Sequence, residues 1–186
     1  MNQVEMNKEA KLSAHFTLGE LTRSKSHPEI YNIPSHVHIE NLKRVCVWLE
    51  ALRERYNLRY VLAGAGGQVP KVEVFVENFI SRPDPEVISR PDSEPIVITS
   101  GYRSAELNRK VGGVATSNHL TGCAVDIRVA GKEQLIRYAC ILLDYADETR
   151  QEFDELLLEH GVGGVIWLHF AVKAQDNRRK INFLKG

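Results

Sequence analysis

Apolar residues recur at intervals of three and four in two stretches of the chain, and this spacing predicts two amphipathic helices. The first helix is expected over residues 37–56 and the second over residues 132–146. In each, charged residues occupy the opposite side. The apolar positions are Ile39, Leu42, Val45, Cys46, Leu49 and Leu52 in the first helix, and Leu135, Ile136, Ala139, Leu142 and Leu143 in the second.

Apolar and polar residues alternate in the second half of the chain, which predicts β-strands. Residues 124–129 read as a half-buried strand, residues 165–172 as a longer one, and residues 96–99 as a short apolar one. Strands and helices do not follow one another in βαβ order. The sequence therefore predicts a single α+β domain, in which a small antiparallel sheet packs with two or more long helices.

Shorter segments complete the predicted outline. Residues 16–21 form a short element, residues 24–34 a loop with two prolines, and residues 105–109 one helical turn. Residues 71–79 alternate as a candidate strand, and residues 153–157 begin another packed segment. These predictions place most of the regular structure in the second half of the chain.

The domain is expected to span residues 16–180, between a flexible N-terminus at residues 1–15 and a C-terminal tail at residues 181–186. A proline-rich stretch at about residues 80–95 interrupts it, and the sequence Ile-Ser-Arg-Pro-Asp occurs there twice. Because proline removes a backbone donor and fixes φ, this stretch cannot form a regular helix or a central strand. We interpret it as a surface insert, with a lid over a site as the alternative.

Composition narrows the class of protein. The chain has 186 residues, 24 Lys and Arg against 24 Asp and Glu, and 43% hydrophobic residues, as expected of one globular domain. Zero net charge argues against a general nucleic-acid binder, and the basic cluster at residues 178–180 is too short to change that. No apolar run approaches the roughly 18 residues that span a bilayer. The N-terminus lacks the apolar segment of a signal peptide, which predicts a cytoplasmic protein.

Three cysteines stand at scattered positions, Cys46, Cys123 and Cys140. An odd number at such spacing argues against a disulfide framework. We expect three small thiols packed in the core.

The densest chemical signal lies at residues 117–126, which read Ser-Asn-His-Leu-Thr-Gly-Cys-Ala-Val-Asp. His119 precedes a turn that Gly122 permits, and Asp126 lies in the strand that follows. If this strand neighbours the one that carries His169, the three side chains converge. Two imidazoles and one carboxylate with an open fourth position are typical of catalytic zinc. The alternative for any single histidine is a surface or core role.

Together with Ser-Gly-Tyr-Arg-Ser at residues 100–104 and Trp-Leu-His at residues 167–169, this string resembles the M15 zinc peptidases. That family includes D-Ala-D-Ala carboxypeptidases, dipeptidases and phage endolysins. The phage- and mobile-element-associated branch is the most similar. The resemblance covers residues 16–172, apart from the proline-rich insert.

The resemblance implies that His119, Asp126 and His169 bind Zn²⁺. It also implies that Arg103 meets a substrate carboxylate or the oxyanion, for which a planar guanidinium is suited, although a surface salt bridge is the alternative. Ser117 is expected to hydrogen-bond near the metal. Trp167 is expected either to form a wall of the pocket or to pack in the core.

One position departs from the family pattern. Well-studied members carry an acid three residues before the last histidine as general base, and this chain has Ile166 there. The phage-like branch has a Phe-Asp-x-Leu-Ile-x-Glu stretch, which resembles residues 153–159 here, so Glu159 is the candidate base. Its alternative is an ordinary acid at the end of a helix. Asp154 and His160 are weaker candidates for the base.

The resemblance implies a zinc metallopeptidase, either a carboxypeptidase or an endopeptidase, that hydrolyses short peptidoglycan peptides, including those with D-amino acids. A catalytically silent zinc module that binds cell-wall peptide or a protein partner is the alternative, and an amidase that cuts between sugar and peptide is another. Such a substrate lies outside the membrane, so a protein without a signal peptide would reach it through lysis or non-classical release. Residues 173–185 carry five positive charges, which suit either an anionic cell wall or a solvated tail.

Overall fold

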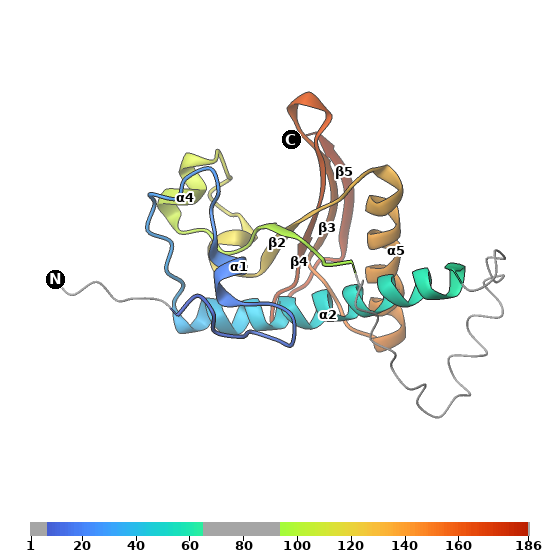
Figure 1. Cartoon of the computed structure of the whole chain (residues 1–186). Helices are drawn as coiled ribbons and strands as arrows, with labels where there is room; N and C mark the ends of the chain where they lie inside the picture. Colours follow the sequence, from blue (N-terminus) through green and yellow to red (C-terminus); the bar gives the residue numbers. More distant parts are fainter. Residues whose placement is uncertain (1–6, 65–93, 186) are drawn as a thin grey trace.

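The computed structural model describes residues 7–64 and 94–185, which fold into one α+β unit (Figure 1). The helices are α1 (Leu18–Thr22), α2 (His36–Gly64), α4 (Ala105–Lys110) and α5 (Lys132–Thr149), with 3-10 turns η1 (Asn118–Thr121) and η2 (Val162–Gly164). The strands are β1 (Ile98–Ser100), β2 (Ala124–Arg128), β3 (Glu155–His160), β4 (Ile166–Ala171) and β5 (Lys180–Lys185). The α+β class and the two long helices are thus confirmed.

The five strands form one sheet in the order β1-β2-β4-β3-β5. Three neighbouring pairs are antiparallel, but β5 runs parallel to β3. The sheet is therefore mixed, whereas the sequence predicted an antiparallel one. The parallel pair arises because the chain leaves β4, loops back past the start of β3 and then runs alongside it, with Lys180 N–H donating to Asp154 O at 3.0 Å.

The predicted C-terminal tail is wrong for most of its length, because residues 180–185 form β5. Ile181 and Phe183 have high strand propensity, and β3 offers them a free edge. Residues 7–15 are likewise not the loose segment that was predicted. Glu50 on α2 accepts hydrogen bonds from Ser13 Oγ at 2.6 Å and from the backbone N–H of His15 at 2.8 Å.

The core lies between one face of the sheet and helices α2 and α5, which pack against each other (Figure 1). Trp48 of α2 sits at its centre, 1% exposed, with its ring 5.1 Å from that of Phe170 on β4. Alternation along β2, β3 and β4 sends every second residue into this core. The opposite face of the sheet carries the polar side chains described below. The residues that face the helices are Val125, Ile127, Leu156, Leu158, Leu168 and Phe170.

Several shorter predictions can be compared with the structure. The strand expected at residues 96–99 is β1, and the turn expected at residues 105–109 is α4. The packed segment from Phe153 becomes strand β3, so Glu159 lies inside a strand and not at the end of a helix. The candidate strand at residues 71–79 and the insert at residues 80–95, except for its last two residues, lie outside the described part of the chain.

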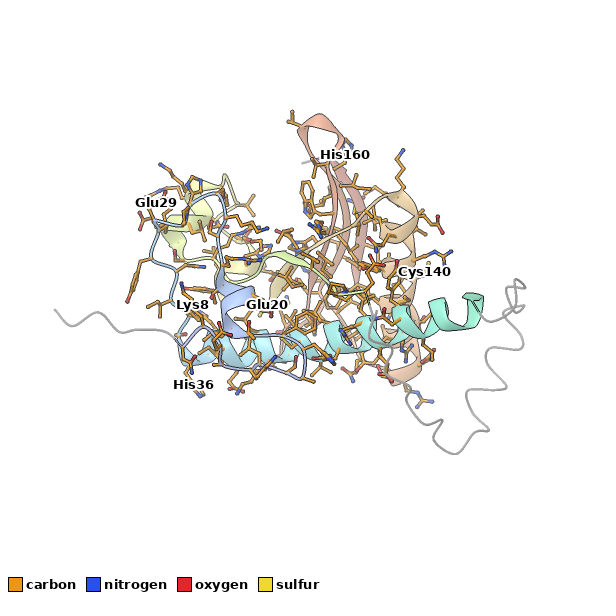
Figure 2. The ribbon with its side chains drawn as sticks, in the orientation of Figure 1. Lys8, Glu20, Glu29, His36, Cys140 and His160 are labelled. Atoms are coloured by element: carbon orange, nitrogen blue, oxygen red, sulfur yellow. The ribbon has the colours of Figure 1, made fainter. Side chains whose placement is uncertain are left out.

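The cysteines follow the prediction in two of three cases. Cys46 and Cys123 are buried free thiols, and burial raises the pKa of Cys46 to about 12. Cys140 is also free but exposed on α5, so it is not the core residue that was expected (Figure 2). Among the described residues, no helix is both long enough and apolar enough to cross a membrane.

Candidate metal centre

His119, Asp126 and His169 come together on the face of the sheet that the long helices do not cover. Asp126 in β2 lies directly opposite His169 in the neighbouring strand β4, and His119 comes from η1, which leads into β2. One ligand atom from each residue lies within 4.8 Å of the other two. The three residues are 2–8% exposed. The convergence that the sequence suggested is therefore what the fold produces.

The turn before β2 sets the orientation of His119. Ser117 caps η1 by accepting from the backbone N–H of His119, and Gly122 ends it with φ of 71°. His119 Nδ1 lies 2.6 Å from the carbonyl oxygen of Gly101, so Nδ1 carries the proton. The other ring nitrogen, Nε2, then faces Asp126 Oδ1 at 3.2 Å with its lone pair free. Burial lowers the pKa of His119, which favours this neutral, ligating form.

His169 is held between two carboxylates. Its Nδ1 lies 2.9 Å from Asp126 Oδ1 and 3.3 Å from His119 Nε2. Its Nε2 lies 3.6 Å from Glu155 Oε2. Burial alone would lower the pKa of His169, but hydrogen bonding to Asp126 and the nearby Glu155 raise it to about 9. Burial likewise opposes ionisation of Asp126, yet the two histidines hold its pKa well below the usual range.

The donor set suits a divalent transition metal. Two imidazole nitrogens and one carboxylate oxygen lie close together, and the buried Asp126 carboxylate also pairs with Arg103. Tetrahedral zinc prefers such ligands, and three of them leave a fourth position open for water or substrate. His119 and His169 each turn one nitrogen inward while the other nitrogen faces a protein oxygen, which is the usual arrangement of ligating histidines.

Arg103 lies against this group and not at the surface. Its Nη2 donates to Asp126 Oδ2 at 2.5 Å, and its Nε donates to Ser100 Oγ at 2.8 Å. Its side chain is 16% exposed, so the alternative of a surface salt bridge does not hold. The guanidinium thus fixes the oxygen of Asp126 that does not face the histidines.

Gly101 shows why the segment before Arg103 contains a glycine. A Cβ at this position would lie 2.2 Å from the carbonyl oxygen of Leu21, an approach that no side chain tolerates. The same residue supplies the carbonyl that orients His119. Gly101 therefore both packs tightly against the backbone of Leu21 and orients the candidate ligand His119.

We expect Gly101→Ala to lower the free energy of unfolding by about 1–3 kcal/mol, because Leu21 must move to admit the methyl group. Chemical denaturation measures this loss. Gly131→Ala is the matched control, since a Cβ there meets no atom within 4 Å; because Gly131 is the N-cap of α5, the change is expected to cost about 0.5 kcal/mol. Equal stabilities of the two variants would contradict the packing argument.

Glu159 lies on the same face of the sheet as the three converging residues. It stands opposite Trp167 of β4, with β4 lying between it and the strand of Asp126, and it is partly buried. Burial raises the pKa of Glu159, and attraction to His169 opposes the rise only in part. Trp167 is half-buried on this face, directly opposite Glu159. Ile166 lies opposite His160 and points to the other face.

The two weaker candidates for the general base, Asp154 and His160, lie away from the converging residues. Asp154 is completely buried, and its carboxylate accepts from Arg178, Lys173 and Asn118 at 2.6–2.9 Å. It is therefore occupied as an anchor for the loop that leads into β5. His160 is exposed at the end of β3, on the face opposite to His169 (Figure 2). Neither residue can exchange a proton at the site.

We expect Asp154→Asn to lower the stability of the metal-free protein by about 2–3 kcal/mol at neutral pH, because the new amide presents a donor to groups that are all donors. These partners hold the pKa of Asp154 well below its usual range. The unfolded chain then binds more protons, so this stabilisation is complete above about pH 5 and fades as the pH falls further. Urea unfolding at pH 7 and pH 3 tests it. A wild-type advantage that persists unchanged at pH 3 would contradict it.

Sequence reasoning missed Glu155. It lies on the same face of β3 as Glu159, close to His169, and is 14% exposed. Residues 155 and 159 are four positions apart, so in a strand they share a face, and this spacing could have placed Glu155 beside the site. The spacing was not used because the segment was not predicted to be a strand.

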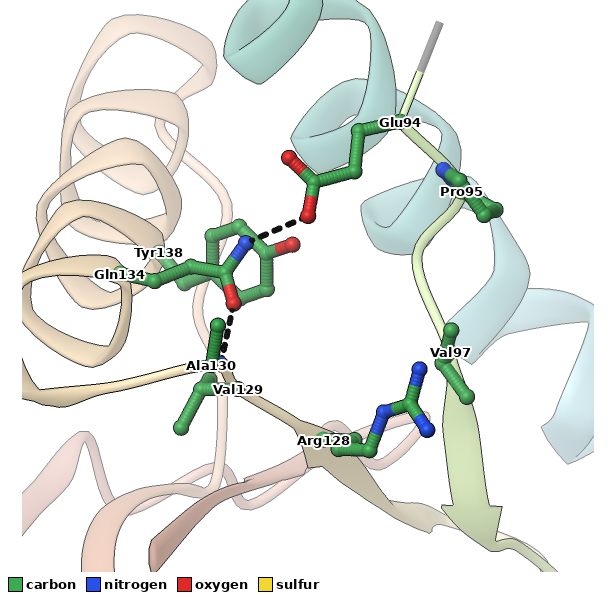
Figure 3. Close-up of a pocket in the computed structure, with 8 residues that line it drawn as sticks. All are labelled: Glu94, Pro95, Val97, Arg128, Val129, Ala130, Gln134 and Tyr138. Atoms are coloured by element: carbon green, nitrogen blue, oxygen red, sulfur yellow. Dashed lines mark hydrogen bonds between the residues drawn. The ribbon is translucent and has the colours of Figure 1, made fainter.

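A separate hollow of about 300 Å³ lies at the far end of β2, between the start of α5 and the residues before β1 (Figure 3). Gln134 bridges it, donating to Glu94 Oε1 at 3.1 Å and accepting from the backbone N–H of Ala130 at 2.6 Å. None of the three converging residues lines it. It is thus distinct from the candidate metal centre.

Comparison with known proteins agrees with this geometry. The family model for peptidase M15 matches residues 86–148, which contain Arg103, His119 and Asp126. A search of curated proteins finds no match. His169 and Glu159 lie beyond the matched residues, so the fold alone brings them to the site. The match supports a peptidase of the metallopeptidase class and does not separate the branches of the family. The matched residues and the His-Asp-His group thus make this part of the chain similar to the M15 peptidases.

Proposed function

We propose that this protein is a zinc-dependent metallopeptidase that hydrolyses an amide bond in short peptidoglycan peptides, including peptides with D-amino acids. The observation that carries the proposal is the convergence of His119, Asp126 and His169, with the carboxylate of Glu159 on the same face of the sheet, in β3 next to β4. The M15 family match supports the peptidase class. Peptidoglycan as the source of the peptide follows from the family resemblance.

His119 Nε2, Asp126 Oδ1 and His169 Nδ1 are the atoms that would hold zinc. A zinc ion bound there would lower the pKa of a water molecule and polarise the scissile carbonyl. Glu159 then accepts a proton from the attacking water and returns it to the leaving amine as the C–N bond breaks. Its raised pKa suits both steps, because a general base works best with a pKa near the operating pH.

Arg103 has two assigned tasks. Its Nε and Nη2 atoms are engaged with Ser100 and Asp126, and they keep the aspartate in place. We assign its remaining Nη1 to a substrate carboxylate or to the oxyanion that forms during hydrolysis. Ser117 supports the site from the backbone by capping η1, and Trp167 borders the space in front of Glu159.

The test is digestion of purified peptidoglycan and a panel of muropeptides by the zinc-loaded protein, with the released products identified by mass spectrometry. The proposal expects new amine and carboxylate ends within the peptide, and none with the metal-free protein or with His119→Ala. Cleavage between sugar and peptide would identify an amidase. No zinc-dependent product across the panel would overturn the enzymatic proposal.

A zinc-bearing module without catalytic activity is the second candidate. Ile166 favours it, because it stands where well-studied members of the family carry their base. This alternative expects peptide binding without turnover, and the same binding in Glu159→Gln. Isothermal titration with a muropeptide distinguishes the two, since turnover by the wild-type protein excludes the silent module.

A further inference from the structure

Glu155 faces the nitrogen of His169 that points away from the candidate metal position. His169 Nε2 is fully buried and has no hydrogen-bond partner within 3.5 Å among the described residues. The nearest acceptor is Glu155 Oε2 at 3.6 Å, so a shift of a few tenths of an ångström completes the bond. The other nitrogen, Nδ1, points to Asp126. The Nδ1 atom of the His169 ring is therefore available to a metal, while its Nε2 atom faces Glu155.

The surroundings of Glu155 consist of donors. Asn118 Nδ2 donates to Oε2 at 2.9 Å, while Arg178 Nη2 and Lys180 Nζ lie 3.0 and 3.2 Å from Oε1. With the Nε2–H of His169, four donors meet two oxygens. A carboxylate has two acceptor oxygens, one for Asn118 and His169 and one for Arg178 and Lys180. A glutamine at this position would replace one of these oxygens with an NH₂ group, which would then face donors.

Glu155 also reaches the second histidine through Asn118. This residue precedes His119 in η1, and its carbonyl oxygen accepts from the backbone N–H of Cys123 at 3.0 Å. Its side chain spans from η1 to the start of β3, where it meets both Asp154 and Glu155. The carboxylate of Glu155 thus contacts His169 in β4 directly and η1, which carries His119, through Asn118.

We propose that Glu155 is a positioning residue that fixes the ring of His169 and strengthens Nδ1 as a zinc ligand. A carboxylate that accepts from the outer nitrogen of a ligating histidine sets its tautomer and raises its basicity. The inference rests on the zinc site of the proposed function. Glu155 acts on the metal through His169 and does not touch the substrate.

In this proposal, the start of the C-terminal strand β5 holds Glu155 in place. Lys180 begins β5 directly opposite Glu155 in the parallel pairing with β3, and Arg178 lies just before it. Both cations hold Oε1, which leaves Oε2 turned toward Asn118 and His169. The basic residues near the end of the chain therefore orient Glu155.

The test measures zinc affinity of the full chain by competition with a chromogenic chelator. Glu155→Gln is expected to raise the zinc dissociation constant about 10- to 100-fold, the usual cost of losing such a partner. Glu152→Gln is the matched control, because it makes the same chemical change at a 57% exposed site. Glu159→Gln is a second control, expected to keep zinc affinity and lose turnover. The visible spectrum of the cobalt-substituted protein should change in Glu155→Gln alone.

A measurement on the wild-type protein covers the case in which Glu155→Gln does not fold. In the zinc-loaded chain, ¹⁵N NMR of imidazole is expected to place the His169 proton on Nε2, with the downfield proton shift of a bond to a carboxylate. A proton that exchanges freely, or a dissociation constant in folded Glu155→Gln within twofold of wild type, would overturn the role of Glu155. Absence of zinc binding by the wild-type protein would overturn the proposed function and this inference together.

Discussion

Glu159→Gln is expected to lower kcat for muropeptide hydrolysis about 10²- to 10⁴-fold, the range that general acid–base catalysis contributes. The amide has nearly the shape of the carboxylate but cannot accept the proton of the attacking water. Zinc content should stay at the wild-type level, because Glu159 is not among the three converging residues. Steady-state kinetics and metal analysis of the same sample measure both quantities.

Glu152→Gln serves as the control for this variant, since Glu152 lies in the loop before β3, exposed and away from the site. Its kcat should equal that of the wild-type protein. If Glu159→Gln turned over peptide at the wild-type rate, another group would have to be the base. Ile166 cannot supply it, and Asp154 and His160 are excluded by their positions.

His169→Ala is expected to abolish hydrolysis and to weaken zinc binding beyond the roughly 10- to 100-fold that loss of an outer partner costs. The substitution removes one of three donor atoms and leaves Asp126 with His119 alone. Zinc retained after gel filtration, together with product formation, measures the effect. Treatment of the wild-type protein with a chelator should reproduce the loss of activity, and added zinc should restore it.

His160→Ala is the matched control for this second prediction. His160 lies on the neighbouring strand, but on the opposite face and exposed to solvent. It should keep both zinc and activity. Retention of stoichiometric zinc and activity by His169→Ala would show that the ion binds elsewhere and would remove the basis of the proposed mechanism.

Local patterns were enough to predict the elements that carry the candidate metal centre. Alternation placed Asp126 and His169 within strands, and pairing of those strands makes them direct neighbours. The turn at Gly122 brings His119 to the same point. The convergence needed only one assumption about long-range structure, namely that the two strands are adjacent.

The remaining features depend on contacts between segments that are distant in sequence. The run from Phe153 to Leu158 is mostly apolar, so it has no period that separates a buried strand from a helix. Its strand conformation becomes clear only from its pairing with β4 and β5. Glu155 and the parallel strand β5 were missed for this reason. Asp154 was misjudged because its cationic partners, Lys173 and Arg178, come from the loop after β4.

We expect His119, Asp126 and His169, on the open face of the sheet, to bind a catalytic zinc ion. A crystal structure of the zinc-loaded protein, with anomalous data collected on both sides of the zinc absorption edge, tests it directly. We predict one peak about 2.0–2.2 Å from His119 Nε2, Asp126 Oδ1 and His169 Nδ1, with a fourth position open toward Glu159. A peak at any other position, or no peak in a protein that carries zinc in solution, would contradict the claim.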